Sequence, residues 1–439
     1  MTALLTLATG VKADDAFVVW DAANATLYFS YGDVPTEGGS WTNEAGNDVT
    51  ATDVWSGTRV TETGGALPNW ISSAQGTCTK VIFEKSFVNV KPNSCNSWFR
   101  NYANLTSIEG LTNLDTSEVT DMSYMFQEYK GEYLDLSSFD TSKVTNMKQM
   151  FSTCTSVKAI VIGDKWNTTH VTGSDDMFSY CNALVGEDET TYNYWAARDV
   201  TKAHAGAGGY LTSNSLYDNA ATTAKYDVLA AAGVSMFKLS GRTIKGGKWN
   251  TLCIPSNIAN LSASALAGAK VKKLKEYTND GASVTITFED ATSIEAGKPY
   301  LVKPTADITD PVFDFAGVAA GSTTVTGAEF IGTYQASTLT APNKKQLFLQ
   351  DDKFYYPGTS DATLNAFRAY FSVTDDVPEA PTSRGIEIDI DGDGVSTGID
   401  FIENKATGEV KVIYDLSGRR VAHPTKGLYI VNGKKVVIK

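Results

Sequence analysis

FDTSKVTNMKQMF, residues 139–151, is one of three copies of a single motif in this chain. The other two are LDTSEVTDMSYMF at residues 114–126 and WNTTHVTGSDDMF at residues 166–178. Trp98-Phe99 takes the place of the final Met-Phe pair upstream, so four units recur at intervals of 25 to 27 residues. This period is typical of a solenoid, in which stacked coils bury apolar side chains that one coil alone leaves exposed.

Each unit contains two kinds of apolar pattern. Residues 132–139 and 156–163 have the alternating or continuous apolar pattern of short strands. Residues 144–151 place two Met and the Phe at positions i, i+3 and i+4, which predicts a short helix with Thr145 or Asn146 as its N-cap. The Val, Met and Phe of every copy are therefore expected in the core.

The composition predicts a mainly β protein with short helices. The 439 residues include 20 Tyr, 19 Phe and 8 Trp beside abundant Thr, Ser, Gly and Asn, which favour strands and turns. The formal net charge is −13 and no run of Lys and Arg exceeds a pair, so nucleic acid is not expected as a partner. No later apolar run approaches the roughly 18 residues of a membrane span.

Shifts in pattern along the chain divide it into five segments. Gly-rich residues 204–210 end the repeats, and strand-like runs separated by Gly, Pro and Asp follow them. The expected segments are a signal-peptide remnant or short strand at 1–13, a β cap at 14–79, the repeat solenoid with its end-cap at 80–212, a β-sandwich at 213–385 and a small β module at 386–439. Asn432-Gly433 predicts a hairpin in the last segment.

The repeats, with their T-S-x-V-T-x-M-x-x-M-F core, resemble the repeat of about 26 residues found in BspA-like leucine-rich-repeat surface proteins of bacteria. The resemblance implies a secreted or surface-anchored protein that acts in adhesion, without enzymatic activity of the repeat. YDLSGRRV at residues 414–421 and KGLYIVNGKKVVIK at residues 426–439 are similar to sorting domains of type IX secretion. That similarity implies export to the exterior of an outer membrane.

Five cysteines are scattered without a CxxC pair, which indicates neither a zinc site nor a disulfide framework. Cys154 and Cys181 occupy the same place in successive units, so stacking would bring them within disulfide reach. Tyr102 and Tyr129 occupy that place in earlier units, which favours the alternative that both cysteines are small apolar core residues.

One acidic stretch has the spacing of a calcium loop. Asp389, Asp391 and Asp393 stand at positions 1, 3 and 5, with Gly394 at position 6 and Asp400 at position 12. The sequences on both sides of this stretch have the pattern of strands, whereas helices flank an EF-hand loop. A solvated acidic turn is therefore the favoured alternative, and no metal ligand is assigned.

No motif of a catalytic site is present. GRTIKGGKW at residues 241–249 is similar to a phosphate-binding loop, but its spacing is one residue too long and Trp249 replaces the Ser or Thr that holds magnesium, so a hairpin is predicted. The three histidines, His170, His204 and His423, lie far apart, and HExxH and GxSxG are absent. We therefore expect no enzyme, no catalytic residue and no cofactor.

The expected function is adhesion or ligand binding through the solenoid, with host or bacterial surface proteins or glycans as partners. Polar repeat positions that differ between copies are the candidate contacts: Glu118, Lys143, Lys148 and Asp164. A carbohydrate-binding accessory protein and a structural subunit of a surface assembly are the alternatives. The aromatic candidates for stacking on sugar are the cap tryptophans Trp20, Trp41, Trp55 and Trp70, for which a place in the core is the favoured alternative.

Overall fold

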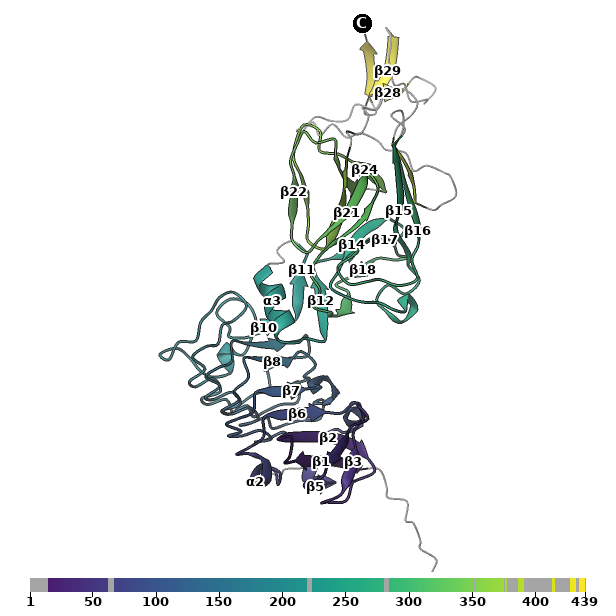
Figure 1. Ribbon diagram of the computed structural model, residues 1–439. Helices are drawn as coiled ribbons and strands as arrows, with labels where there is room; N and C mark the ends of the chain where they lie inside the picture. Colours follow the sequence, from purple (N-terminus) through teal and green to yellow (C-terminus); the bar gives the residue numbers. More distant parts are fainter. Residues whose placement is uncertain are drawn as a thin grey trace, which may run out of the picture.

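The protein is mainly β, as its composition predicts, and its parts follow one another along an elongated molecule (Figure 1). The computed structural model describes residues 15–61, 67–218, 223–279, 284–350, 352–374 and 376, together with 386–390, 413–414, 427–431 and 434–438. Within these residues, no helix has both the length and the apolar character needed to cross a bilayer. The stretch 1–13 lies outside them.

The N-terminal cap shares one sheet with the start of the solenoid. β1 (Asp15–Asp21) pairs antiparallel with β2 (Thr26–Gly32) and with β5 (Asp53–Ser56). β2 then pairs parallel with β6 (Lys80–Phe83), which pairs parallel with β7 (Ser107–Glu109). The smaller elements here are β3 (Ser40–Thr42), β4 (Asp48–Thr50), α1 (Thr58–Thr61), α2 (Ile71–Ala74), η1 (Lys85–Asn89) and η2 (Leu111–Asn113).

The later coils of the solenoid contribute a second parallel sheet of β8 (Tyr133–Leu136), β9 (Ala159–Ile162) and β10 (Thr212–Ser213). β8 and β9 lie inside the two strands predicted at 132–139 and 156–163, which confirms those predictions. Figure 1 shows the strands of successive coils stacked between the cap and the C-terminal half.

The helix predicted at residues 144–151 is wrong, because this segment is a series of turns in the structure. Its side chains are nevertheless buried as predicted: Met147, Met150 and Phe151 are fully inaccessible to solvent. The backbone differs because Gln149 and Thr153 have left-handed conformations, with φ of 50° and 64°, which an α-helix does not contain.

Left-handed residues recur at the same two positions of every unit. They have φ between 50° and 66° and are Ser97 and Asn101, Tyr124 and Glu128, Gln149 and Thr153, and Asp176 and Tyr180. Such a conformation costs about 1–2 kcal/mol for an L-residue. It persists here because it turns alternate N–H groups out of the coil and toward the next one.

A ladder of backbone hydrogen bonds therefore joins the coils. Met122 N–H donates to the Asn146 carbonyl over 2.9 Å, and Tyr124 N–H donates to the Lys148 carbonyl over 2.9 Å. The same register joins Cys95, Ser97 and Phe99 to Asp121, Ser123 and Met125, and Met147, Gln149 and Phe151 to Gly173, Asp175 and Met177. N–H groups between these rungs bond three residues back within the coil. We name this set of bonds the coil ladder.

A column of aromatic rings runs through the solenoid core beside the coil ladder. Phe126 lies 5.9 Å from Phe99 and 5.9 Å from Phe151, and Phe151 lies 5.5 Å from Phe178. Phe29 of the cap and Tyr210 of the end-cap contact the two ends, 5.9 Å from Phe99 and 5.6 Å from Phe178. The cap and end-cap thus cover the apolar ends that a stack of repeats leaves.

The chain passes from the solenoid into the C-terminal half at residue 214, between β10 and β11 (Ser215–Tyr217). β11 pairs with β12 (Met236–Ser240), which pairs with β19 (Val312–Asp314), and α3 (Thr223–Ala231) lies beside them (Figure 1). At this joint Lys225 of α3 forms an ion pair with Glu187 of the end-cap and donates to Ser213 Oγ over 2.8 Å. Both side chains of the pair are largely buried, 8% and 13% exposed.

The rest of the C-terminal half is built on two sheets of five strands that face each other. One contains β14 (Asn250–Cys253), β17 (Pro299–Lys303), β15 (Lys270–Asn279), β16 (Val284–Asp290) and β27 (Ile386–Asp389), and the other β20 (Ser322–Val325), β21 (Ala328–Thr333), β26 (Arg368–Val373), β23 (Gln346–Gln350) and β24 (Lys353–Tyr355). Phe288, Phe330 and Phe371 pack between them, with the last two rings stacked at 4.3 Å. The smaller elements are β13 (Thr243–Ile244), β18 (Ile308–Thr309), β22 (Ser337–Leu339), β25 (Ala362–Leu364), η3 (Val200–Lys202) and η4 (Leu261–Ala263).

One predicted boundary and one predicted hairpin need correction here. β27 pairs with β16 and Ile390 is buried in the sandwich core, so the sandwich extends past the boundary predicted at residue 385. The hairpin predicted at residues 241–249 is wrong, because β13 pairs with β18 whereas β14 pairs with β17.

The C-terminal strands β28 (Ile413–Tyr414), β29 (Gly427–Val431) and β30 (Lys434–Ile438) form an antiparallel sheet. Val431 lies opposite Lys434, as a two-residue hairpin requires, although the predicted turn Asn432-Gly433 lies outside the described residues.

We predict that Phe151→Ala destabilises the solenoid by about 3–5 kcal/mol, because it leaves a cavity in the aromatic column. Thr153→Gly, two residues away, is the matched control. It should change the free energy of unfolding by no more than about 1 kcal/mol, since relief of the left-handed strain offsets the greater chain entropy of glycine. Urea unfolding followed by circular dichroism measures both, and equal destabilisation by the two changes would contradict this account.

We predict that Glu187→Gln destabilises the joint by about 2–3 kcal/mol, because it leaves the buried Lys225 charge uncompensated. Lys143→Gln, which removes an exposed ion pair with Glu118, should cost less than about 1 kcal/mol.

The same pair should make stability depend on pH. Burial acts to raise the pKa of Glu187, but bonds from Lys225 and Ser213 outweigh it and hold the pKa below its usual range. The stabilisation is therefore present above about pH 4.3, the ordinary Glu value, and is lost as the pH falls further. Thermal unfolding between pH 3 and 7 should show this loss in the native chain and not in Glu187→Gln.

Candidate functional site

The polar repeat positions proposed as contacts are mostly occupied within the molecule. Glu118 and Lys143 form an ion pair at 2.7 Å on neighbouring coils. Asp164 pairs with Lys238 of β12 at 2.8 Å, and Lys148 is only partly exposed. Glu118, Lys143 and Asp164 are therefore held in ion pairs within the molecule, and a partner could contact them only by displacing those pairs.

The last coil instead exposes a group of aromatic side chains. Trp195 is 89% exposed, Tyr180 49% and Tyr194 46%. The Tyr194 ring lies 5.2 Å from the Trp195 ring and 5.9 Å from the Tyr180 ring, and the Arg198 guanidinium lies 5.3 Å from the Tyr194 ring. We name Tyr180, Tyr194, Trp195 and Arg198 the aromatic cluster.

The loop that holds the aromatic cluster is tied to the coil beneath it. Phe178 N–H donates to the Arg198 carbonyl over 3.0 Å, and the Arg198 guanidinium pairs with Asp176 at 3.3 Å. Tyr180 N–H donates to the Tyr192 hydroxyl over 3.0 Å. These bonds fix the loop backbone, so the exposed rings are presented from an ordered support.

The cap tryptophans do not provide the exposed aromatic surface, and the predicted core position is confirmed for three of them. Trp20, Trp55 and Trp70 are buried in the cap, and Trp41 is half-buried with its edge against Phe17. The available signal was TTYNYWAARDV, residues 190–200, which contains three aromatic residues without the alternation of a strand.

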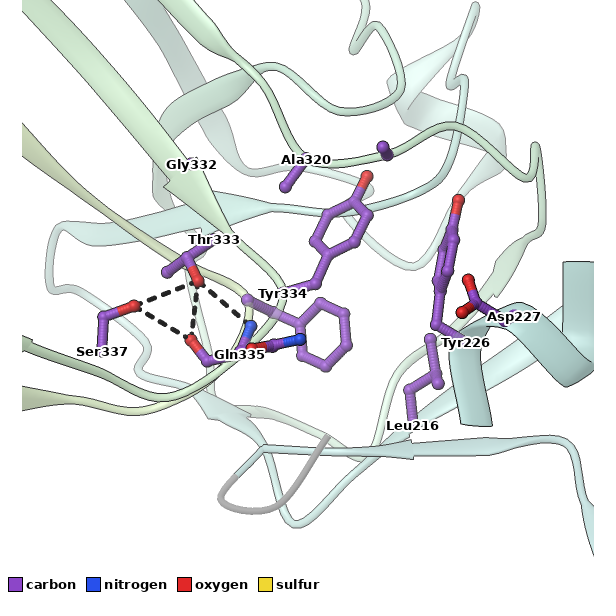
Figure 2. Close-up of a pocket in the computed structure, with 11 residues that line it drawn as sticks. Leu216, Tyr226, Asp227, Ala320, Gly332, Thr333, Tyr334, Gln335 and Ser337 are labelled. Carbon is purple, nitrogen blue, oxygen red and sulfur yellow. Dashed lines mark hydrogen bonds between the residues drawn. The ribbon is translucent and has the colours of Figure 1, made fainter. Parts of the chain in front are cut away.

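A pocket of about 330 Å³ lies in the C-terminal half, between α3 and the end of β21 (Figure 2). Tyr226 of α3 faces Tyr334 with 5.5 Å between ring centres, and Tyr334 stacks on Phe367 at 5.5 Å. Leu216 adds to this apolar wall. A volume at the low end of the usual ~300–1,000 Å³ suits one small ligand.

Polar groups lie on the other side of the same pocket. Ser337 Oγ donates to Thr333 Oγ1 over 3.2 Å, and Gln335 N–H donates to Thr333 Oγ1 over 3.1 Å (Figure 2). Gln335 lies on this side too, whereas Asp227 lines the pocket beside Tyr226 on α3 (Figure 2). The pocket thus combines flat apolar rings with a few polar groups, as small-molecule sites do.

The two tyrosine hydroxyls of the pocket differ. Tyr334 Oη donates to the Val318 carbonyl over 2.8 Å, whereas Tyr226 Oη is buried and has no hydrogen-bond partner among the described residues. Burial, followed by the charge of Asp227, raises the pKa of Tyr226, so its hydroxyl stays protonated at neutral pH. A ligand acceptor in the pocket would satisfy this donor.

A second, polar pocket of about 410 Å³ lies where the C-terminal end of α3 meets β7 and β8. Its carboxylates Glu109 and Glu132 pair with Lys80 and Lys158, each at 2.8 Å. Burial raises the pKa of Asp135, which accepts a bond from Ser137 N–H over 2.9 Å. These carboxylates are held in ion pairs and hydrogen bonds of the fold.

No group of metal-ligating side chains occurs in the part of the chain that the structure describes. Of the calcium candidates, only the backbone of Asp389 in β27 is described, and Asp391, Asp393 and Asp400 lie outside. His170 is exposed near Thr169 Oγ1, His204 lies in the end-cap, and His423 lies outside the described residues.

The five cysteines are free thiols in the core, so the disulfide between Cys154 and Cys181 is not formed. Cys154 Sγ donates to the Phe126 carbonyl, and Cys181 Sγ donates to the Phe151 carbonyl one coil on. Burial raises the pKa of Cys154 to about 12, so the thiol is unreactive at neutral pH.

Residues 93–215 match the family described as Mycoplasma protein of unknown function, DUF285. This range contains the repeats and the end-cap with its aromatic cluster. The match is consistent with a bacterial protein built from such repeats. Neither a curated protein nor a solved structure matches the chain.

Proposed function

We propose that this is a non-catalytic protein of the bacterial surface that adheres to a partner protein through the aromatic cluster. The observation that carries the proposal is Trp195, a large apolar ring that is 89% exposed and stands beside two further exposed rings and an arginine. Trp, Tyr and Arg are the residues most enriched in the energetic centres of protein interfaces.

The place of the aromatic cluster supports the same function. It lies on the last coil, within the segment that matches the repeat family, and Tyr194 and Trp195 stand in the loop that follows the last motif. The likeness of the repeats to BspA-like proteins supports display at the surface. The likeness of residues 414–439 to sorting domains supports the exterior of an outer membrane as the location.

We predict that Trp195→Ala lowers adhesion of the full chain to intact target cells at least tenfold without changing its thermal stability, since a central aromatic contact contributes about 2 kcal/mol or more. Labelled protein is titrated onto epithelial or bacterial cells and bound label is counted. Val88→Ala, which trims another exposed apolar side chain far along the sequence, is the control and should bind like the native chain.

Treatment of the target cells separates the partner classes. Protease treatment should abolish binding, and periodate oxidation of surface glycans should not. Equal adhesion by Trp195→Ala and the native chain would refute the role of the aromatic cluster, and sensitivity to periodate alone would refute a protein partner.

The pocket between α3 and β21 favours a second candidate function, binding of a neutral sugar. Its stacked rings suit the apolar face of a pyranose, and Tyr226 Oη offers an unused donor. Gln335 and Asp227 supply acceptors for sugar hydroxyls.

We predict that Tyr226→Phe weakens sugar binding about tenfold and leaves the unliganded protein equally or more stable, because it removes a buried donor that lacks a partner. Tyr334→Phe should instead lower stability, since it leaves the Val318 carbonyl without its donor. Glycan-array binding and thermal unfolding measure the two effects. Absence of any glycan signal from the native chain would exclude this second function.

A further inference from the structure

A third pocket, of about 220 Å³, lies at the edge of the sandwich where β14 meets the end of β23 and the start of β26. The segment GRTIKGGKW, residues 241–249, forms much of its wall. Arg242, Lys245, Lys248 and Arg368 line it, and none of the described residues that line it is acidic. This concentration of positive charge occurs in a chain whose formal net charge is −13.

The carboxylates that pair with these cations are not part of the lining. Lys245 pairs with Asp307 at 3.0 Å, and Lys248 pairs with Asp352 at 3.2 Å. Both lysine side chains remain more than half exposed, 62% and 51%, so their ammonium groups keep donors that face solvent. Each lysine ammonium group has three N–H donors, and its bond to one carboxylate does not use all of them.

The two arginines share a single carboxylate. Arg368 Nη2 donates to Asp218 Oδ2 over 2.9 Å, and its other nitrogen bonds the second oxygen of the same group. Arg242 is 1% exposed, and Asp218 is 3.5 Å from its Nη1. Arg242 Nη2 donates to the Thr251 carbonyl, whereas its Nε and Nη1 have no hydrogen-bond partner among the residues that the structure describes.

The charge around the pocket is therefore unbalanced among the described residues. Trp249 also lines the pocket, and its ring lies 5.5 Å from the ammonium of Lys303, which is outside the lining. The four cations of the lining thus pair with three carboxylates, Asp218, Asp307 and Asp352, and none of these three lines the pocket. A buried guanidinium with unused donors is costly unless a negative charge compensates it.

We propose that this pocket binds a small oxyanion, meaning a carboxylate, sulfate or phosphate group. Arg368 and the two lysines provide charge-assisted donors at its mouth, and Arg242 supplies positive charge from its buried side. The volume lies below the range usual for drug-sized ligands, so the ligand is a free anion or one acidic group of a larger molecule.

Isothermal titration calorimetry of the full chain tests this proposal. Sulfate, phosphate and glucuronate are titrated separately, with chloride adjusted to keep the ionic strength constant. Sulfate and phosphate report a free anion, and glucuronate reports an acidic sugar. We expect saturable binding at one site by at least one of them.

The double variant Lys245→Gln/Lys248→Gln should weaken that binding at least about tenfold, because it removes two charge-assisted contacts. Lys143→Gln is the control, because it makes the same Lys-to-Gln change on the solenoid. Lys143→Gln and Trp195→Ala should both bind the anion with the affinity of the native chain. Absence of saturable binding by all three anions would overturn the proposal, as would unchanged affinity in the double variant. Neither result bears on adhesion through the aromatic cluster.

Discussion

The coil ladder is the constraint on which the rest of the structure depends. Its rungs leave each coil through every second N–H group, so a coil cannot satisfy its own backbone and requires a neighbour on each side. The left-handed residues that make this possible, such as Tyr124 and Gln149, would be strained in isolation. The hydrogen bonds between coils and the burial of Met and Phe together offset that strain, and both form only when coils are stacked. Stability is thus a property of neighbouring pairs of coils rather than of one coil.

A stack of this kind has two open ends, and the chain closes each with a different device. At the N-terminal end the cap extends the parallel sheet through β2 and β6 and covers the aromatic column with Phe29. At the other end Tyr210 covers the column, and the chain then enters the C-terminal half through β10 and β11. Val161 of β9 is buried in the core of that half rather than in the solenoid core, so the solenoid sheet itself forms part of the junction. The ion pair of Glu187 with Lys225 is a second link across it.

The sequence predicted the buried residues of the solenoid better than its backbone. Spacing of Met147, Met150 and Phe151 is compatible with a helix and with the observed turns, because both bring these side chains to one face. The helix and the observed turns differ in whether a backbone N–H group bonds within its own coil or to the next coil. The apolar spacing within one unit does not decide between these two bonding patterns. The mainly β class and the strands β8 and β9 follow from local pattern alone. The pockets do not, because Tyr226 and Tyr334, or Arg242 and Arg368, meet only through the pairing of strands distant in sequence.

The positions fixed by the repeat have little freedom to acquire a binding role. Their apolar side chains are buried, and their Asp and Thr side chains form hydrogen bonds with the backbone of turns. Glu118 and Lys143 form an ion pair with each other. Side chains with unused chemistry occur where the period is interrupted: Trp195 after the last motif, Tyr226 on α3 and Arg242 at the sandwich edge. A regular stack favours this division, since a change at a repeated position disturbs both neighbouring coils, whereas a change in an irregular loop disturbs neither. Recognition in this protein is therefore best sought in the segments that interrupt or follow the repeat.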